Sequence, residues 1–303
     1  MSHPCSHPYQ SVFKANLFAD KTVIVTGGGS GIGRCTAHEL AGLGASVVLL
    51  GRKLDKLEIV AAEIAEDGGK ASCFACDIRE EDIVKATVTD ILSKHDVIHG
   101  LVNNAGGQFP SPLTGINQKG WETVVRTNLT GGFLMAKEVY LKSMAKHGGS
   151  IVNIVADMWG GMPGMGHSGA ARAGMVNFTQ TAAVEWAASG VRVNAVAPGW
   201  VASSGMDSYP DSMKPWIIGL RDAVPLKRMG TEAEVSSAIC FLLSDGANFI
   251  SGDCLRIDGA ASQGGRVVPL PAAKNSVSYD GFHRSVVPRI FRQETPRPEM
   301  EDK

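Results

Sequence analysis

The sequence contains no run of about 20 apolar residues that could span a bilayer. Its first eight residues, Met1-Ser-His-Pro-Cys-Ser-His-Pro8, show no basic segment followed by an apolar stretch, so they do not look like a signal peptide. A strong charge of either sign is also missing. The formal net charge is −1, so nucleic acid is not expected as the main partner. These absences predict a cytoplasmic protein with no membrane or nucleic-acid partner.

Cysteine is sparse and forms no metal-binding pattern. The six cysteines are scattered through apolar or strand-like segments, which is typical of reduced, buried thiols in an intracellular protein. Cys73 and Cys76 are spaced as C-x-x-C, but this spacing puts them on opposite faces of a strand, and no second pair follows. His3 and His7 lie beside Cys5 in a terminus that we expect to be frayed. No metal site is therefore predicted.

Length and composition indicate one large α/β domain. The 303 residues are 44% apolar, which is enough for a sizeable core. The domain is predicted to cover residues 17–265, after a loose lead-in of residues 1–16. Residues 266–303 hold many prolines and charges but only short apolar pieces. They are predicted to form an arm that wraps a neighbouring subunit or stays partly disordered.

The chain is organised around a glycine-rich turn. A buried strand, Val23–Val25, stops at five glycines between Gly27 and Gly33, and apolar residues then recur at helical spacing. The glycines therefore lie at a helix N-terminus, whose free N–H groups favour a pyrophosphate. The strict G-x-G-x-x-G pattern is absent, and the chain instead spells T-G-x-x-x-G-x-G from Thr26. Such turns also occur without a ligand.

Strand and helix patterns alternate along the rest of the chain. Further strands are expected at 46–50, 71–76, 100–103, 150–155, 191–199 and 254–257, and further helices at 54–64, 80–93, 121–140, 168–186 and from 231. Thr231 and Glu234 form a capping box at the start of the last helix. This alternation predicts a doubly wound, seven-stranded parallel sheet of the Rossmann type.

The glycine turn and a second signature, Asn103-Asn104-Ala105-Gly106, resemble the short-chain dehydrogenase/reductase family over roughly residues 17–262. In that family the asparagines fasten a strand end beneath a nicotinamide dinucleotide, so the resemblance implies an NAD(P)-dependent oxidoreductase. The contacts that it implies for the cofactor are Gly27, Ser30, Gly31, Ile32, Asp77, Ile78, Asn104, Ala105, Gly106, Pro198 and Gly199. Asp77 would contact the adenine, and it is almost as well explained as a helix cap.

The residues after the second strand favour NADP(H) over NAD(H). An acidic residue at this position holds the ribose 2′-hydroxyl of NAD, whereas a basic residue accommodates a 2′-phosphate. The chain has Arg52 and Lys53 there, with Arg34 behind the glycines and no carboxylate before Asp55. NAD(H) stays possible, because the two basic residues are also explained as a solvated helix start.

The tyrosine and lysine that this family uses for proton transfer are missing. The family's Tyr-x-x-x-Lys motif falls on Ser168 and Arg172, and none of the four tyrosines can be moved into register. A guanidinium does not release a proton at working pH, so Arg172 is expected to position the cofactor ribose and support charge. Ser168 lies one helical turn before it and is expected to donate a hydrogen bond to a substrate oxygen.

Three further polar residues are catalytic candidates. Asn128 resembles the family asparagine whose backbone supports a bound water in the proton relay, but its side chain is also explained by pairing with its neighbours. Asp157 and His167 flank the strand end and the helix start, and either is a candidate proton donor. A hydrogen bond with Ser168 or plain exposure explains them at least as well.

A serine in place of the tyrosine favours one reaction over others. Reduction of an α,β-unsaturated thioester leaves an enolate that needs hydrogen bonds, while its α-carbon takes a proton from water. The stretches 106–109, 119–121 and 167–174 resemble peroxisomal trans-2-enoyl-CoA reductases, and the serine also resembles dienoyl-CoA reductases. The same stretches resemble bacterial citronellol/citronellal dehydrogenases. Reduction of an apolar enoyl-CoA is therefore predicted first and terpenoid alcohol oxidation second. Dinucleotide binding without chemistry is the third alternative.

Methionine and tryptophan in two loops predict an apolar substrate. These loops are Met158–Met165 and Trp200–Trp216, although lid core or a subunit interface explains them too. The cations available to a CoA group are Lys214, Arg221, Lys227 and Arg228, which are equally explained as scattered surface charges. The resemblance also implies a homodimer or homotetramer, formed through the helices led by Trp121 and Ser168 and through the last strand.

Overall fold

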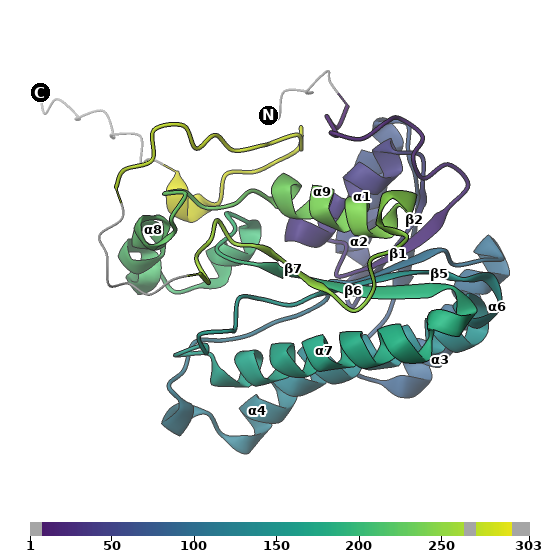
Figure 1. The fold of residues 1–303 in the computed structure, drawn as a ribbon, viewed down its shortest axis with the longest axis horizontal. Helices are drawn as coiled ribbons and strands as arrows, with labels where there is room; N and C mark the ends of the chain where they lie inside the picture. Colours follow the sequence, from purple (N-terminus) through teal and green to yellow (C-terminus); the bar gives the residue numbers. More distant parts are fainter. Residues whose placement is uncertain (1–7, 264–270, 293–303) are drawn as a thin grey trace, which may run out of the picture.

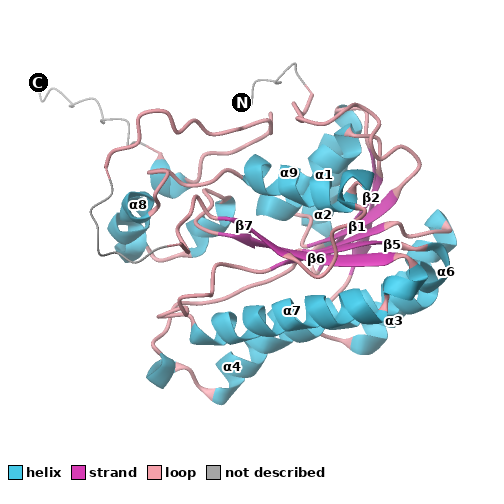
Figure 2. Ribbon diagram, viewed as in Figure 1, coloured by secondary structure: helices cyan, strands magenta, loops and turns pink. Residues whose placement is uncertain are grey.

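The computed structural model describes residues 8–263 and 271–292, so the expectation for Cys5 and its histidine neighbours lies outside the described residues. Seven strands form one sheet with helices on both faces (Figures 1 and 2). The strands are β1 (Thr22–Thr26), β2 (Ser46–Gly51), β3 (Lys70–Ala75), β4 (Gly100–Asn103), β5 (Gly149–Ile154), β6 (Val191–Pro198) and β7 (Cys254–Ile257).

The strand order is β3-β2-β1-β4-β5-β6-β7, and every neighbouring pair is parallel. This order confirms the doubly wound α/β prediction. The register places Thr26 beside Leu50 and Val25 beside Val102, so the turns after β1, β2 and β4 meet at one edge. The order reverses between β1 and β4, and ligands of such sheets bind at the carboxyl ends of the strands beside the reversal.

Two layers of helices cover the sheet. The α-helices of the described residues are α1 (Gly31–Gly42), α2 (Leu54–Glu66), α3 (Glu81–His95), α4 (Gln118–Val125), α5 (Gly131–Val139), α6 (Ala145–His147), α7 (Gly166–Glu185), α8 (Lys214–Ala223) and α9 (Glu232–Leu243). Helices α1, α2 and α9 pack on Val23 and Val25, whereas α3, α5 and α7 pack on Ile24 from the opposite face (Figure 1). β1 is therefore buried on both faces, as its apolar run predicts. The capping box of Thr231 and Glu234 is confirmed.

The helix predicted at 121–140 begins earlier and is not a regular α-helix. The side chain of Asn117 accepts the N–H of Gly120 (2.8 Å) and caps α4, so the helix starts at Gln118. Two π-helical turns, η2 (Arg126–Thr130) and η3 (Tyr140–Met144), interrupt the helical run, which continues through α6. Such turns insert a residue into a helix and are frequent at functional sites.

The loop expected between Trp200 and Trp216 is partly helical. Two short 3₁₀ turns, η5 (Ser204–Ser208) and η6 (Asp211–Met213), lead into α8, which has a proline in its first turn. Ile217 and Leu220 form the buried side of α8. Residues 201–224 are called the lid below. No helix is predicted over residues 214–223, because the pattern that marks α8 is only three turns long.

The structure describes residues 271–292 of the predicted C-terminal arm, and the expectation that the arm wraps a neighbouring subunit or stays partly disordered stays a prediction. Residues 271–292, called the C-terminal strap below, fold back over the chain's own α1, α9 and lid (Figure 1). Phe282 is 1% exposed and packs with Cys35 of α1 and Ala233 of α9. Tyr9 of the lead-in packs against the same cluster.

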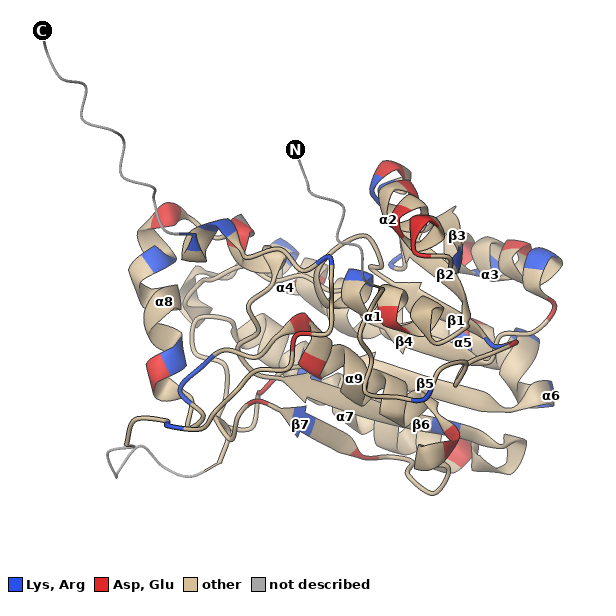
Figure 3. Cartoon of the chain, turned by 90° about the horizontal axis from the view of Figure 1, so that it is seen from above, with Lys and Arg blue, Asp and Glu red and all other residues tan. Residues whose placement is uncertain are grey.

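Figure 3 shows that positions of Lys and Arg and positions of Asp and Glu are interspersed along the helices. Neighbouring charges pair within and between helices: Glu81 of α3 pairs with Lys85 of the same helix (3.1 Å) and with Lys137 of α5 (2.7 Å). No helix in residues 8–263 and 271–292 is long and apolar enough to cross a bilayer.

Candidate active site

Thr26 ties together the carboxyl ends of β1 and β4. Its Oγ1 donates to the carbonyl of Val102 (3.2 Å) and accepts the N–H groups of Asn104 (3.0 Å) and Ala105 (2.9 Å). The side chain of Asn104 donates in return to the carbonyls of Thr26 (2.9 Å) and Gly27 (3.3 Å). The prediction that this asparagine fastens the strand end is confirmed.

The glycine turn packs so closely against Asn104 that no side chain fits on Gly27 or Gly33. A Cβ atom on Gly27, which has φ +66°, would lie 2.9 Å from Asn104 Nδ2. A Cβ atom on Gly33 would collide with the carbonyl oxygen of Gly27 and with the same amide. Gly31 and Ile32 begin α1, so their N–H groups belong to a helical first turn that lacks helical acceptors. The cradle therefore suits a phosphate.

A cavity of about 230 Å³ opens above this turn and contains most of the predicted cofactor residues. The predicted residues that line it are Gly27, Ser30, Arg52, Asp77, Ile78, Asn104, Ala105 and Gly106. Gly51, Arg79 and Thr127 also line it and were not predicted. A helix N-terminus, backbone walls and a guanidinium match the pyrophosphate and adenosine ribose of a dinucleotide, so the residues present fit that cofactor.

The basic residues expected near the cofactor have separate positions. Arg52 lines the cavity, whereas Lys53 is the exposed residue that precedes α2. Arg34 points away and makes an ion pair with Glu63 (2.8 Å) on the strap side of the molecule, so its expected support for NADP(H) is wrong. Asp77 accepts from Arg79 (2.8 Å), and these hydrogen bonds lower the pKa of the Asp77 carboxyl. Glu80, not Asp77, precedes α3, so Asp77 is not its cap.

The serine at the tyrosine position is fully buried at the start of α7. Ser168 Oγ donates to the side-chain oxygen of Gln108 (2.6 Å), which belongs to the loop after β4. The ring of His167 is also fully buried, lies edge-on to Phe109 at 4.5 Å, and accepts the backbone N–H of Ser168 at Nδ1. The other ring nitrogen, Nε2, has no partner among the described residues. His167 therefore braces the start of the helix beside Ser168.

Arg172 lies one turn along α7 and directly beneath the loop that carries Gly106. Its guanidinium donates to the carbonyl of Ile154 at the end of β5. One of its nitrogens lies 2.7 Å from the position that a Cβ atom on Gly106 would take. Burial lowers the pKa of Arg172 to about 10, so the side chain stays protonated at neutral pH. Its Nε is buried without a partner in the described chain, which leaves one donor available to a ligand.

Asn128 connects the π turn η2 to the same loop. Its Oδ1 accepts the N–H of Gly107 (2.9 Å) and its Nδ2 donates to the carbonyl of that glycine (2.9 Å). The alternative in which its side chain pairs with neighbours is therefore confirmed. Both hydrogen bonds are made with Gly107, the residue before Gln108. They therefore fix the backbone of the segment whose Gln108 side chain binds Ser168. The proposed support of a water by the Asn128 backbone stays a prediction.

Asp157 follows β5 and lies beside the ends of β6 and β7. Its N–H donates to the carbonyl of Pro198 (3.3 Å). Burial raises the pKa of Asp157, and the nearby Asp258 carboxylate raises it further. A Cβ atom on Gly199 would lie 2.8 Å from Cα of Asp258, so this corner of the site is tightly packed. The catalytic role of Asp157 stays a prediction, with Asp258 and Arg256 as its charged neighbours.

The two loops predicted to contact an apolar substrate contain both exposed and buried side chains. Trp159 is 40% exposed and stacks on Arg256 at 3.9 Å, but Met206 is buried with Ile217 and Leu220 in the lid. The lid-core alternative is thus confirmed for Met206. Among the cations expected to meet a CoA group, Arg228 is already paired with Glu234 (2.7 Å).

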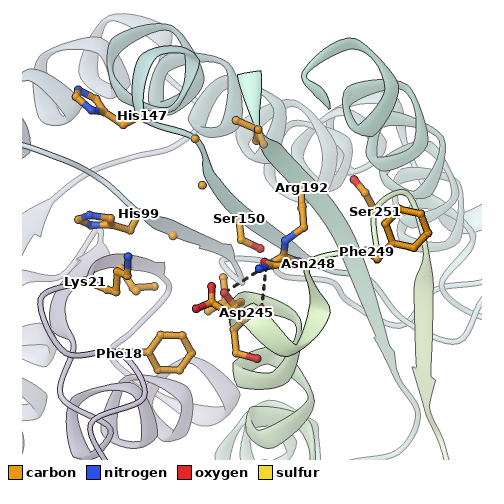
Figure 4. Close-up of a pocket in the computed structure, with 18 of the residues that line it drawn as sticks. Phe18, Lys21, His99, His147, Ser150, Arg192, Asp245, Asn248, Phe249 and Ser251 are labelled. Atoms are coloured by element: carbon orange, nitrogen blue, oxygen red, sulfur yellow. Dashed lines mark hydrogen bonds between the residues drawn. The ribbon is translucent and has the colours of Figure 1, made fainter. Parts of the chain in front are cut away.

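A second cavity, larger than the one above the glycine turn, lies away from these groups. It measures about 590 Å³ and is lined by residues at the amino ends of β1, β4, β5 and β6, including Lys21, His99 and Arg192 (Figure 4). Arg192 donates there to the carbonyl groups of Leu242 (2.7 Å) and Ser244 (3.1 Å) and so closes the end of α9. Ligands of parallel sheets bind at the opposite ends of the strands, so this cavity is not the active site.

Among residues 8–263 and 271–292, one group of side chains that could bind a metal lies outside the site. His38, Asp67 and His283 bring one ligand atom each within 4.8 Å of one another. Asp67 also accepts from Arg284 (2.9 Å), and Glu63, which accepts from His38 (3.1 Å), pairs with Arg34. The carboxylates are therefore already neutralised by guanidinium groups, and the cluster is explained as an ion-pair network.

A family model described as enoyl-(acyl carrier protein) reductase matches residues 27–262. The chain belongs to the short-chain dehydrogenase/reductase family. A probable 2,4-dienoyl-CoA reductase of Bacillus subtilis is 35% identical over 242 residues, which are 79% of this chain and 95% of that protein. The chain is therefore an oxidoreductase of a family that binds NAD(P).

Solved structures agree with this assignment. A Pseudomonas aeruginosa structure titled citronellol catabolism dehydrogenase (AtuB) is 65% identical, has a TM-score of 0.77, and covers 84% of this chain and 100% of its own. A putative NAD(P)-dependent gluconate 5-dehydrogenase of Beutenbergia cavernae with bound NADP is 30% identical with a TM-score of 0.76, covering 82% of this chain and 99% of its own.

Sequence reasoning missed Gln108, Arg79 and Thr127. Gln108 belongs to a stretch that carries a resemblance, and the available signal was a polar side chain two residues after the N-N-A-G signature. Arg79 follows Asp77 by two residues, a spacing at which a local ion pair forms in a turn. Thr127 reaches the cavity because of η2, and no pattern in the sequence marked that turn.

Proposed function

We propose that the protein is an NADP(H)-dependent reductase of the C=C bond in an apolar α,β-unsaturated thioester. The observation that carries this proposal is the buried Ser168 hydroxyl at the position of the missing tyrosine, held by Gln108. A serine is too weak an acid to protonate an alkoxide in place of tyrosine, but it suits an enolate oxygen, which needs only hydrogen bonds.

In this proposal, Ser168, Gln108 and Arg172 have separate roles. Without substrate, the side-chain oxygen of Gln108 accepts the single proton of the Ser168 hydroxyl. When the thioester binds, the hydroxyl turns and donates that proton to the thioester carbonyl oxygen instead. Arg172 stays protonated and stabilises negative charge beneath the Gly106 loop, and its free Nε is available to a ribose hydroxyl. A bound nicotinamide dinucleotide would supply the hydride for the β-carbon. The α-carbon takes its proton from water, so no tyrosine is needed.

NADP(H) is proposed over NAD(H) because Arg52 lines the cavity where an acidic residue would select NAD. The cavity holds Arg79 as well, although its pairing with Asp77 leaves it less free to meet a phosphate. We further infer a cytoplasmic homo-oligomer, a dimer or a tetramer, whose catalytic domain spans residues 17–265.

A second candidate is a citronellol or related terpenoid alcohol dehydrogenase. The 65% identity to the structure titled citronellol catabolism dehydrogenase favours it. This reaction requires a base to remove the hydroxyl proton, and the nearest titratable candidates are Asp157 and His167. Both candidates share an apolar substrate, in accord with the methionine and tryptophan side chains of the loops around the site.

The deciding experiment is NADPH oxidation at 340 nm with trans-2-enoyl-CoA esters of graded chain length, beside NADP⁺ and NAD⁺ reduction with citronellol. Thioester turnover that falls ~100-fold in Ser168→Ala supports the first candidate. Citronellol turnover alone supports the second and assigns a base to the site. Tight NADPH binding with neither reaction contradicts both and favours the third alternative, dinucleotide binding without chemistry.

A further inference from the structure

The C-terminal strap lies outside residues 27–262, the part of the chain that the family model explains. Its first half is anchored beside the dinucleotide turn. Thr231 donates to the carbonyl of Tyr279 (2.5 Å), and the hydroxyl of Tyr279 donates to the carbonyl of Gln10 (2.5 Å). The ring of Phe282 is fully buried, with the guanidinium of Arg34 at 5.0 Å from its centre.

The next two residues of the strap are held by α2. His283 lies 2.8 Å from the carboxylate of Asp67, and Arg284 pairs with both Asp67 (2.9 Å) and Glu66 (2.9 Å). These contacts fix the strap to α1 and to the end of α2, in the part of the protein that contains the dinucleotide turn. The position of the strap's far end therefore depends on these two helices.

The far end enters the core of the lid. The 3₁₀ turn η8 (Arg289–Phe291) places Ile290, which is 8% exposed, among Met206 of η5 and Ile217 and Leu220 of α8. The N–H of Ile290 also donates to Asp207 (3.3 Å). In the described chain this cluster has four buried side chains, and one of the four comes from the strap.

Apart from the strap, the lid contacts the rest of the described chain mainly at its two ends. Val201 forms a β-bridge with Gly230, and the N–H of Ser204 donates to Glu232, whereas Trp216 on α8 is 49% exposed. The lid follows Pro198 and Gly199 directly, at the carboxyl end of β6. A small helical unit in this position covers the substrate side of the site, and a unit with so small a core depends on each core residue.

We propose that Ile290 is a positioning residue: the strap holds the lid in place through it and so determines how tightly a long apolar substrate chain is retained. The part that concerns substrate rests on the proposed function. The part that concerns the lid does not, because it follows from the strap contacts alone.

The test compares Ile290→Asp and Ile290→Ala with Ile290→Leu and with Val287→Asp, a matched strap variant at a side chain that is 60% exposed. Hydrogen exchange of residues 214–223 is measured with NADPH present, so no substrate is required. We expect exchange in α8 to accelerate about tenfold or more in the Asp variant, less in the Ala variant, and not in the two controls. The amides of β1 and β4 keep the wild-type rate.

Kinetics with short and long enoyl thioesters supply the second readout. In Ile290→Asp we expect KM for a ten-carbon chain to rise about tenfold, with kcat, NADPH affinity and KM for a four-carbon chain within about twofold. Ile290→Leu restores the wild-type KM. Unchanged exchange in α8, or an equal increase throughout the sheet, overturns the proposal. If the wild type reduces no thioester, the proposed function fails, and exchange in α8 still decides whether the strap holds the lid.

Discussion

The candidate active site has two halves, one for the cofactor and one for the substrate, and the two halves are held together by different kinds of contact. Beside β1 and β4, the contacts come from backbone groups, glycines and the short side chains of Thr26 and Asn104. Beside β5 and β6, they come from longer side chains that cross between elements, such as Gln108 to Ser168 and Arg172 to Ile154. The first half depends on turn geometry, whereas the second depends on packing.

This difference explains how the family's chemistry has changed on one side only. The cradle for a dinucleotide tolerates almost no substitution, because a Cβ atom at Gly27 or Gly33 would meet backbone or Asn104. The proton-transfer side has replaced both usual residues and is held by partners from other segments. Variants in the two halves should therefore fail in different ways.

The largest effect is expected for Gly33→Ala. The added methyl collides with the Gly27 carbonyl and Asn104, so the turn must open and dinucleotide binding should weaken by about 100-fold or more. Fluorescence titration with NADPH measures this loss. Gly42→Ala, in the same helix α1 but with its nearest neighbour at 3.7 Å, is the control and should bind normally. A folded Gly33→Ala protein of wild-type affinity would show that the two halves are equally tolerant.

Ser168→Ala should affect only the substrate half. Loss of the hydroxyl removes the donor to the substrate oxygen, so kcat for enoyl thioesters should fall ~100-fold. The NADPH dissociation constant should stay within about twofold, because Ser168 does not line the dinucleotide cavity. Ser93→Ala, at an exposed hydroxyl on α3, is the matched control. An equal loss of cofactor affinity would break the division between the halves.

Glu232 connects the halves and should make dinucleotide affinity depend on pH. Its Oε1 is the nearest atom to a Cβ position on Gly31 (3.8 Å), and it faces Arg34, Asp280 and the backbone N–H of Ser204 in the lid. Burial raises the pKa of Glu232 to about 7. Above that pH the carboxylate is charged and repels the pyrophosphate, so affinity should fall about three- to tenfold between pH 6 and pH 8.5.

The variant Glu232→Gln should flatten that pH profile and retain the higher affinity at pH 8.5. NADH is titrated in parallel with NADPH, because the 2′-phosphate has a pKa of its own near this range. Calorimetry in buffers of different ionisation enthalpy should show proton uptake on binding by the wild type near pH 7. A profile that is the same in wild type and variant would exclude Glu232 as the cause.

The smallest effect is expected at Arg284, which does not line the dinucleotide cavity and does not contact Ser168. Its ion pairs with Asp67 and Glu66 are partly exposed to solvent, so Arg284→Ala should lower stability by ~1 kcal/mol or less. Thermal denaturation at low and high salt measures this, with Lys274→Ala as the exposed strap control. A drop of many degrees would mean that the strap is part of the fold's main core.

The cofactor half was predictable in detail because its interactions are local. Gly27, Ser30, Asn104, Ala105 and Gly106 were assigned from short signatures and all line the cavity. Helix boundaries depended on similarly local signals: the capping box of α9 was recognised, whereas the Asn117 cap of α4 was not. Arg34 shows the limit, since its partner Glu63 lies on another helix.

The sequence by itself determined the order of strands and helices, the glycine cradle and the absence of the usual tyrosine and lysine. These follow from residue type and spacing over a few positions. Only the tertiary structure decided that Gln108 meets Ser168, that Asn128 clamps Gly107 through a π turn, and that Ile290 enters the lid. Such contacts join residues 21 to 84 positions apart. Their formation depends on how packed elements bring side chains together, which no local pattern encodes.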